Sequence, residues 1–284
     1  ASGTATGNLL TRHGRLSFSR RTAIMAILNV TPDSFCDGGR RLDPERAIAD
    51  GIEMAEAGAD VIDIGGESTR PGSSRVSVDK EISRVVPVIE GLAKRFDTPI
   101  SIDTSKSQVA RAAVEAGAEI INDISGLRFD EKIAAVAAEH KTGLVLMHSL
   151  GAFDAMHSQP PVDDIIIEVA ADFRRSTHTA FTSGVKPEQI VLDIGIGFGK
   201  TLDQNLELIG KLDKLIADFP QFPMLVGTSR KSFIGKLLDD APPDQRLSGS
   251  LASIAIAVWN GAKIVRVHDV RETVETLKVV VALR

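Results

Sequence analysis

Apolar residues along the chain recur in two alternating patterns, a helical one and a short β-branched one. The phrases GADVID at 58–63, GAEIIN at 117–122 and GAKIVR at 261–266 each follow a stretch with apolar residues at helical spacing. The first stretch opens with Asp43 as the expected N-cap and Pro44 at the first helical position. A glycine stands where each helix should stop, and a short strand follows. The pattern therefore predicts a repeated helix–turn–strand unit.

Five further apolar runs fit the same rhythm: 23–29, 99–103, 143–148, 189–194 and 224–229. The runs are almost wholly apolar, which is typical of a parallel sheet with both faces covered. Eight strand–helix units within about 250 residues predict an α/β protein with a TIM (β/α)8 barrel. A doubly wound open sheet is the alternative.

The chain has no composition break or linker, so we predict a single barrel domain over residues 21–284. An N-terminal extension over residues 1–20 precedes it. Within this extension we predict a short hairpin or cap in front of the first barrel strand.

Each predicted strand ends in polar or charged residues. In a TIM barrel these ends face the same rim, where active sites lie. A single Asp or Asn is as readily a helix N-cap or a loop anchor, but polar residues at every predicted strand end favour a polar pocket. The strand-end residues are Asn29, Asp63, Asp103, Asn122, His148, Asp193, Ser229 and Arg266 with His268.

Glycine-rich loops follow four of these strands, at 29–39, 65–72, 195–200 and 227–235. Glycine lets the backbone approach a ligand closely. TSRKS at 228–232 supplies hydroxyls and two cations beside backbone N–H groups at a predicted helix start. This combination suits an anion such as phosphate, and a solvated basic helix start is the alternative.

The stretch DIGIGFGKT at 193–201 is similar to the tail of a nucleotide-binding P-loop. That motif needs a glycine at position 194, where Ile194 stands. The barrel pattern is also wrong for a P-loop enzyme. We therefore expect Lys200 to be a surface or supporting cation, and Phe198 to offer a ring face to a flat ligand.

The composition of the chain mainly argues against particular classes of protein and of site. Of 284 residues, 43% are hydrophobic and 25% are charged, as in globular proteins. The net charge of −5 disfavours a nucleic-acid surface. No apolar run is long enough for a membrane helix, and the opening residues lack the apolar core of a secretory signal. A single cysteine, Cys36, excludes an internal disulfide and a Cys-rich zinc site and fits a reducing compartment. We expect a cytoplasmic location.

Taken together, the loops closely resemble those of the dihydropteroate synthase family. The matching pieces run in one order from Ile27 to Val270: ILNVTPDSF with DGG, DIGGESTRPG, SIDTSK, NDISG, VLMH, GIGFGK, GTSRKSFIG and RVHDV. The resemblance implies a TIM-barrel transferase of folate biosynthesis that is commonly a homodimer, uses Mg²⁺ and is a sulfonamide target. The implied reaction joins 6-hydroxymethyl-7,8-dihydropterin pyrophosphate to p-aminobenzoate, giving 7,8-dihydropteroate and pyrophosphate.

The resemblance also implies roles for individual residues. Carboxylates accept N–H groups of an amino-pyrimidinone, and an amide offers both a donor and an acceptor. The implied pterin contacts are Asp103, Asn122, Ile124, Met147, Asp193 and Lys231, with Asp63 behind them. The implied pyrophosphate contacts are Asn29, Arg70, Ser229, Arg266 and His268, with Asn29 as the Mg²⁺ ligand. The implied p-aminobenzoate contacts are Thr69, Arg70, Pro71, Phe198, Lys231 and Ser232.

We expect the catalytic residues to be Asp103, Asp193, Lys231 and Arg70. The family mechanism is dissociative, so anions beside the ring favour the developing cation while Arg70 stabilises the leaving group. A pterin-binding methyltransferase and a non-catalytic pterin-binding relative are the rival interpretations.

The chain departs from the family pattern at three positions, Cys36, Ile194 and Ser149. None of them removes a charged group that the implied chemistry needs.

Overall fold

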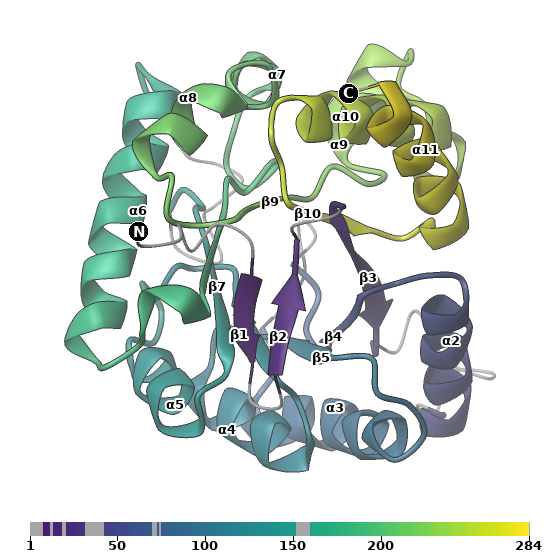
Figure 1. Cartoon of the computed structure of the whole chain (residues 1–284), viewed down its shortest axis with the longest axis vertical. Helices are drawn as coiled ribbons and strands as arrows, with labels where there is room; N and C mark the ends of the chain where they lie inside the picture. The colour runs from purple at the N-terminus through teal and green to yellow at the C-terminus, as the bar shows by residue number, and fades with distance from the viewer. Residues whose placement is uncertain are drawn as a thin grey trace.

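A closed barrel of eight parallel strands forms the centre of the molecule in the computed structural model (Figure 1). The structure describes residues 8–11, 14–18, 21–31, 43–69, 73, 75–151 and 160–283. Neighbouring strands follow the chain order, and the last strand pairs with the first. This closure excludes the doubly wound alternative. The strands are β3 (Ala23–Asn29), β4 (Val61–Gly65), β5 (Ile100–Asp103), β6 (Ile120–Asp123), β7 (Gly143–Met147), β8 (Ile190–Asp193), β9 (Met224–Val226) and β10 (Ile264–Val267).

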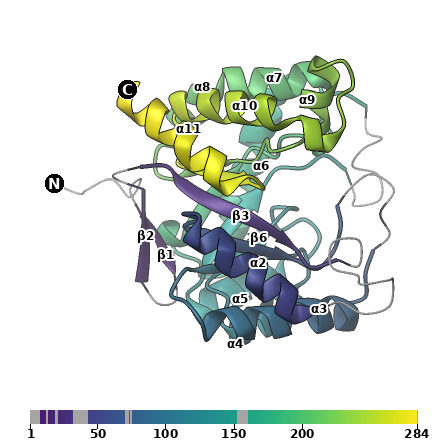
Figure 2. The ribbon, with the colours of Figure 1, turned by 90° about the vertical axis from the view of Figure 1, so that its right-hand side faces the viewer.

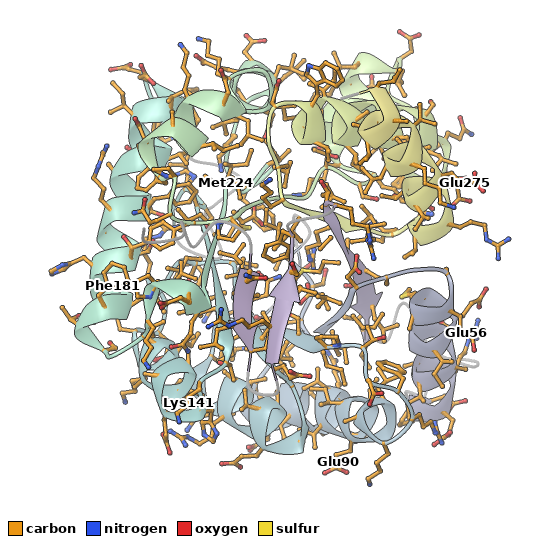
Figure 3. All side chains as sticks on the ribbon, in the orientation of Figure 1. Glu56, Glu90, Lys141, Phe181, Met224 and Glu275 are labelled. Atoms are coloured by element: carbon orange, nitrogen blue, oxygen red, sulfur yellow. The ribbon has the colours of Figure 1, made fainter. Side chains whose placement is uncertain are left out.

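Helices surround the barrel, and exposed charged side chains lie on their outer faces. Figure 3 shows the exposed Glu56, Glu90, Lys141 and Glu275 at the outer edge of this ring. The α-helices are α2 (Pro44–Glu56), α3 (Val78–Ala93), α4 (Ser107–Ala116), α5 (Lys132–His140), α6 (Ile165–Thr182), α7 (Leu202–Gly210), α8 (Leu212–Asp218), α9 (Ser232–Leu237), α10 (Leu247–Trp259) and α11 (Val270–Leu283), and the 3₁₀ turns are η3 (Pro187–Gln189) and η4 (Pro243–Gln245).

The predicted helix–turn–strand repeat is confirmed at its ends. The Asp43 side chain accepts a hydrogen bond from Glu45 N at 3.0 Å and so caps α2, with Pro44 at the first position. Gly58, Gly117 and Gly261 have φ of 108°, 126° and 110°. Because side chains with a Cβ avoid this backbone region, glycine ends the helix before each of the three strands.

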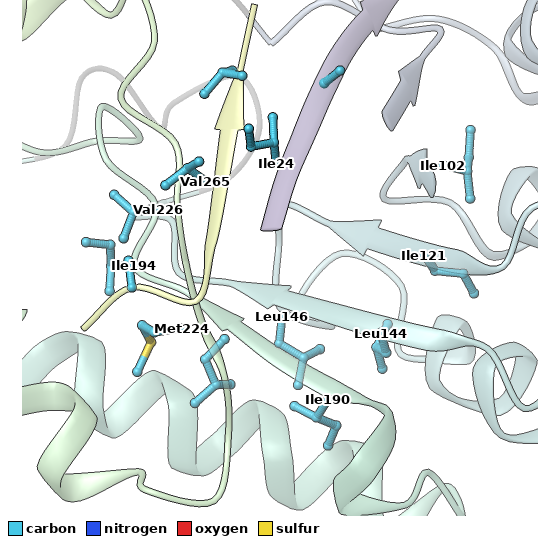
Figure 4. Packing of buried hydrophobic residues seen from close by; sticks show 14 of the residues in the cluster. Ile24, Ile102, Ile121, Leu144, Leu146, Ile190, Ile194, Met224, Val226 and Val265 are labelled. Carbon is cyan, nitrogen blue, oxygen red and sulfur yellow. The ribbon is translucent and has the colours of Figure 1, made fainter. Parts of the chain in front are cut away.

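Alternation along the strands divides the core into two layers. Ile24 and Ala26 face the helices, in the layer that Figure 4 shows with Ile102 and Leu144. Met25 faces the barrel interior in a second cluster of buried residues. The barrel is therefore a packed core, and its chemistry must lie at an end.

A two-stranded hairpin covers the amino-terminal end of the barrel. Strands β1 (Asn8–Thr11) and β2 (Gly14–Ser17) pair antiparallel. Leu9 and Phe18 are 1% and 2% exposed and belong to the cluster inside the barrel. Thr11 Oγ1 donates to Glu119 Oε2 at 2.9 Å, beside β6. In Figure 2 the hairpin lies at the end of the barrel opposite the carboxyl end of β3.

Candidate functional site

The carboxyl ends of four neighbouring strands place predicted site residues in one row. Backbone pairing sets Asn29 opposite Gly65, Gly65 opposite Asp103, and Asp103 opposite Asn122. A Cβ added to Gly65 would lie 3.7 Å from both Asn29 Oδ1 and Asp103 Cβ. A side chain here would contact both groups, so the glycine keeps the position between the amide and the carboxylate free of side-chain atoms, at the rim where barrel active sites lie.

Arg266 joins two carboxylates of this rim. Its Nε donates to Asp63 Oδ2 at 2.6 Å, and its Nη2 donates to Asp103 Oδ2 at 2.7 Å. Asp63 lies inside β4 rather than at its end, but its side chain reaches the same network. The guanidinium is therefore held in one orientation by two anions.

Asn122 adds a buried acceptor to the network. Its Nδ2 donates to Asp63 Oδ2 at 3.0 Å, which sets the orientation of the amide. Asn122 Oδ1 is buried and accepts no hydrogen bond from the described residues. A buried oxygen of this kind costs free energy unless something donates to it, so it suits an N–H group of a ligand.

Burial shifts the charges of the site. It raises the pKa of Asp103 to about 7, although Arg266 opposes the shift and the Asp63 carboxylate adds to it. Burial also raises the pKa of Asp193, against the opposing charge of Lys231. It lowers the pKa of Lys231 to about 8, with Asp193 opposing. Perturbed groups gathered at one rim are typical of functional sites.

Lys231 crosses to the loop between β8 and α7. Its Nζ donates to Ile196 O and lies 4.7 Å from the centroid of the Phe198 ring. In the same loop, Gly195 N donates to Asp193 Oδ1 at 2.8 Å. The loop therefore fixes both the cation and the carboxylate.

Apolar side chains line the rim next to these groups. Ile124 and Met147 are 5% and 3% exposed and pack with the partly buried Phe129 and Phe198. Met147 is also paired in register with Asp193. The arrangement gives a flat ligand apolar faces beside a polar edge. Phe129 escaped the sequence analysis because no glycine-rich loop marks it.

Ser229 and His268 lie against each other after β9 and β10. Ser229 Oγ is 3.1 Å from His268 Nδ1, and His268 N donates to Ser229 Oγ at 3.2 Å. Beside them, Arg230 Nε donates to Asp269 Oδ2 at 3.0 Å. These contacts join the two loops, and the hydroxyl and imidazole offer donors to an anion.

Asp123 is a buried carboxylate behind the site that the sequence analysis missed. It is fully buried and accepts hydrogen bonds from Ser125 N at 2.8 Å and Leu127 N at 2.7 Å. Burial raises its pKa to about 6, and the bonds from Ser125 oppose the shift. Asp123 therefore shapes the loop that carries Ile124. The spacing Asp-x-Ser after a strand, typical of an Asx turn, was the available signal.

Lys200 is a supporting cation rather than a phosphate ligand. Its Nζ donates to Gly195 O at 2.6 Å, and to His148 O and Phe198 O at 3.3 Å each. A Cβ on Gly195 would lie 1.8 Å from His148 O, so this glycine allows close packing of two loops. The resemblance to a P-loop is therefore coincidental.

His148 is buried beneath the rim. Burial lowers its pKa to about 2, and the neighbouring Lys200 and Arg128 charges add to the shift. The imidazole is therefore neutral at physiological pH.

Ser149, one of the three departures, ties two loops together. Its Oγ donates to Ile124 O at 3.0 Å and accepts from Arg128 Nη2 at 2.6 Å. Ile194, the second departure, is fully buried in the layer between strands and helices. The third departure, Cys36, lies outside the described residues.

The predicted p-aminobenzoate contacts are described only in part. Thr69 is partly buried, and Ser232 is exposed as the first residue of α9. Arg70 and Pro71 lie outside the described residues.

The described residues contain no cluster of three or more His, Cys, Asp or Glu side chains suited to a metal ion. The side-chain oxygen of Asn29, beside the space above Gly65, is of the type that Mg²⁺ prefers. Among the helices within the described ranges, none has the length and apolar character needed to span a bilayer.

Residues 25–268 match the family model described as pterin binding enzyme. The dihydropteroate synthase of Synechocystis sp. is 47% identical over 266 residues, covering 94% of this chain and 91% of the relative. The match thus extends over almost the whole barrel.

Solved structures agree with the sequence matches. The Xanthomonas albilineans dihydropteroate synthase with 4-aminobenzoic acid has a TM-score of 0.88 and 42% identity, and the match covers 95% of each chain. The Yersinia pestis dihydropteroate synthase in a sulfonamide drug complex has a TM-score of 0.89 and 44% identity, and the match covers 98% of each chain.

Proposed function

Because the chain belongs to the dihydropteroate synthase family, we propose that it condenses 6-hydroxymethyl-7,8-dihydropterin pyrophosphate with p-aminobenzoate. The products are 7,8-dihydropteroate and pyrophosphate. The observation that carries the proposal is the buried Asn122 Oδ1, which accepts no hydrogen bond from the described residues and is paired in register with Asp103, while Asp193 lies two strands further round the same rim. A pterin edge has N–H groups that Asn122 Oδ1 and the carboxylates can accept.

The pterin ring would lie against apolar side chains, with its polar edge toward Asn122 and Asp193. Ile124 and Met147 supply a wall, and Asn122 Oδ1 and Asp193 accept ring N–H groups. Lys231 donates to the ring carbonyl or a ring nitrogen. Its present acceptor, Ile196 O, shows that the ammonium already reaches toward the Asp193 loop.

Charge near the ring favours bond cleavage before attack. When the C–O bond to pyrophosphate breaks, the pterin methylene becomes cationic, and Asp103 and Asp193 stabilise that charge when they are ionised. The arylamine of p-aminobenzoate then attacks. It needs little help from a base because an arylamine is neutral at pH 7.

The leaving pyrophosphate needs donors at the same rim. Ser229, His268 and Arg266 supply them, since Arg266 keeps Nη1 after its bonds to Asp63 and Asp103. The sequence resemblance adds Arg70 to this set.

Asn29 would hold Mg²⁺ through its amide oxygen, with the remaining ligands from water and the substrate phosphates. When bound, the ion would supply charge stabilisation for the leaving group.

For p-aminobenzoate, Phe198 offers a ring face, and Lys231 lies 4.7 Å above that ring. Thr69 and Ser232 complete the described part of this set, and Pro71 is added by the sequence resemblance. Sulfonamides would compete for this site, as the Yersinia pestis complex suggests by similarity.

We further propose a homodimer and a cytoplasmic location. Ile256 and Trp259 on α10 are 52% and 53% exposed, and large apolar side chains of this kind often lie in interfaces. A single cysteine fits a reducing compartment.

The assay that tests the function measures pyrophosphate release from the pterin pyrophosphate with and without p-aminobenzoate. We expect release that depends on p-aminobenzoate, with dihydropteroate formed in equal amount. A pterin-binding methyltransferase would release none, and neither would a non-catalytic pterin-binding protein. The absence of release, or release that does not depend on p-aminobenzoate, would overturn the proposal.

A further inference from the structure

A buried ion cluster lies beside the candidate site, at the base of the loop between β4 and α3. Lys106 Nζ donates to Glu67 Oε1 at 2.8 Å and to Glu81 Oε2 at 2.6 Å. The side chains of Lys106, Glu67 and Glu81 are 13%, 7% and 0% exposed. The proposed reaction uses none of the three, although their desolvation is costly.

The cluster ties together the two ends of the loop. Glu67 Oε1 accepts from Val76 N at 2.6 Å, and Lys106 Nζ also donates to Val76 O at 2.8 Å. Residues nine positions apart are thus joined through one carboxylate and one ammonium. Further along the same loop, Ser73 Oγ donates to Ser68 Oγ at 2.9 Å. Together these bonds close the neck of the loop.

The residues before this neck are also fixed. Arg84 Nη1 on α3 donates to Gly66 O at 2.7 Å. A Cβ on Gly66 would lie 2.7 Å from Val85 Cγ1, so the backbone packs closely on the helix. Because consecutive Cα atoms are about 3.8 Å apart, the position of Glu67 restricts that of Thr69, two residues on.

We propose that Glu67 and Lys106 are positioning residues, which close the neck of the β4–α3 loop and hold Thr69 in place for p-aminobenzoate. This inference depends on the proposed function, because it assigns Thr69 to that substrate. Glu81 has a different part: its carboxylate accepts from Lys106, and its Cγ packs against the start of the loop, 3.1 Å from a Cβ added to Gly66, but it makes no bond across the neck between Glu67 and Val76.

Glu67 is the residue to change, because Lys106 follows Asp103 by three positions and its loss would disturb the pterin site too. Glu67→Ala removes the acceptor for Val76 N and one partner of Lys106. We expect the KM for p-aminobenzoate to rise about tenfold, since the conformation that holds Thr69 in place becomes a minor population. The affinity for a pterin analogue, measured by calorimetry, should stay within about twofold, since Asp103, Asn122 and Asp193 are untouched.

The matched control is Glu81→Gln, which removes the other carboxylate from the same ammonium. We expect a lower Tm with the KM for p-aminobenzoate within about twofold of the wild type. Glu67→Gln keeps an oxygen that can accept from Val76 N and Lys106. Its KM for p-aminobenzoate should therefore lie close to that of the wild type. If Glu67→Ala does not fold, Glu67→Asp is measured instead, because it keeps the charge but is too short to span the neck.

Wild-type enzyme is assayed first, so that failure of the proposed function is recognised before the variants are compared. A purely structural cluster would lower the Tm and the yield of active enzyme without changing the KM. An unchanged KM in folded Glu67→Ala and Glu67→Asp overturns the inference. An equal rise in KM for Glu67→Ala and Glu81→Gln overturns it as well.

Discussion

Arg266 Nη2 lies 2.7 Å from Asp103 Oδ2, although the two residues are 163 positions apart in the chain. The contact crosses the rim from β10 to β5. It offsets part of the burial that raises the pKa of Asp103 to about 7. The two residues therefore determine together how the site responds to pH.

The first prediction concerns stability against pH. The folded-state pKa of Asp103 lies above its ordinary value of 3.8. Between about pH 4 and pH 7 the folded protein therefore holds a proton that the unfolded chain releases, and stability falls as pH rises, by at most about 1.4 kcal/mol per pH unit. Asp103→Asn removes this contribution. In urea unfolding, the variant should gain stability relative to wild type as the pH rises across that range. A difference in unfolding free energy that stays constant with pH would contradict the prediction.

A second prediction concerns Asp193. Asp193→Ala leaves pterin N–H groups unpaired in a closed site, which costs about 1.5–3 kcal/mol, or roughly ten- to a hundredfold in affinity. Calorimetry with a pterin analogue measures the loss. Asp213→Ala, at an exposed position on α8, is the control and should bind normally. Unchanged affinity in folded Asp193→Ala would remove Asp193 from the pterin site.

The third prediction separates two lysines. Lys231→Ala should lose far more activity per folded molecule than Lys200→Ala, because only Lys231 faces the proposed ligands. Lys200→Ala should instead lower the Tm, since the carbonyl groups of His148, Gly195 and Phe198 each lose the hydrogen bond from the ammonium. ATP with Mg²⁺ should give no thermal shift. An ATP-dependent shift that Lys200→Ala abolishes would restore the P-loop interpretation.

The fourth prediction compares two glycines. Gly195→Ala would place a Cβ 1.8 Å from a backbone oxygen at a φ of 62°, so we expect destabilisation of more than about 3 kcal/mol. Gly210, at the end of α7, has no atom within 4 Å of the added Cβ. Gly210→Ala should be neutral, or stabilising by up to about 1 kcal/mol. Chemical denaturation measures both, and similar values for the two variants would argue against the close packing at Gly195.

The sequence predicts strand positions well wherever the strand is buried on both faces. The run 23–29 was expected as a strand and corresponds to β3. The carboxyl ends are less exact: runs were expected to reach His148 and Ser229, but β7 and β9 stop at Met147 and Val226. After β9 the backbone turns, and Lys231 N donates to Thr228 O, whereas after β7 His148 N still donates to Asp193 O of the neighbouring strand at 2.9 Å, so that end differs by a single residue.

The side-chain pairings across the barrel could not be predicted from the sequence. Strand-end polarity indicated Asp63, Asp103 and Arg266 separately, but only ring closure brings them into one network. The hydrogen bonds of Lys200 were equally hidden, because its carbonyl partners come from two loops. Local pattern carries periodicity and turn chemistry, while contacts between distant positions depend on the closed fold.

The hairpin at the closed end has a practical consequence for handling the enzyme. Leu9 and Phe18 seal that end, and Figure 2 shows the hairpin on the side away from the carboxyl end of β3. A linker joined to the amino terminus should therefore attach the protein to a sensor surface with its rim turned toward the solution. Binding measured on such a surface should match binding measured with free protein.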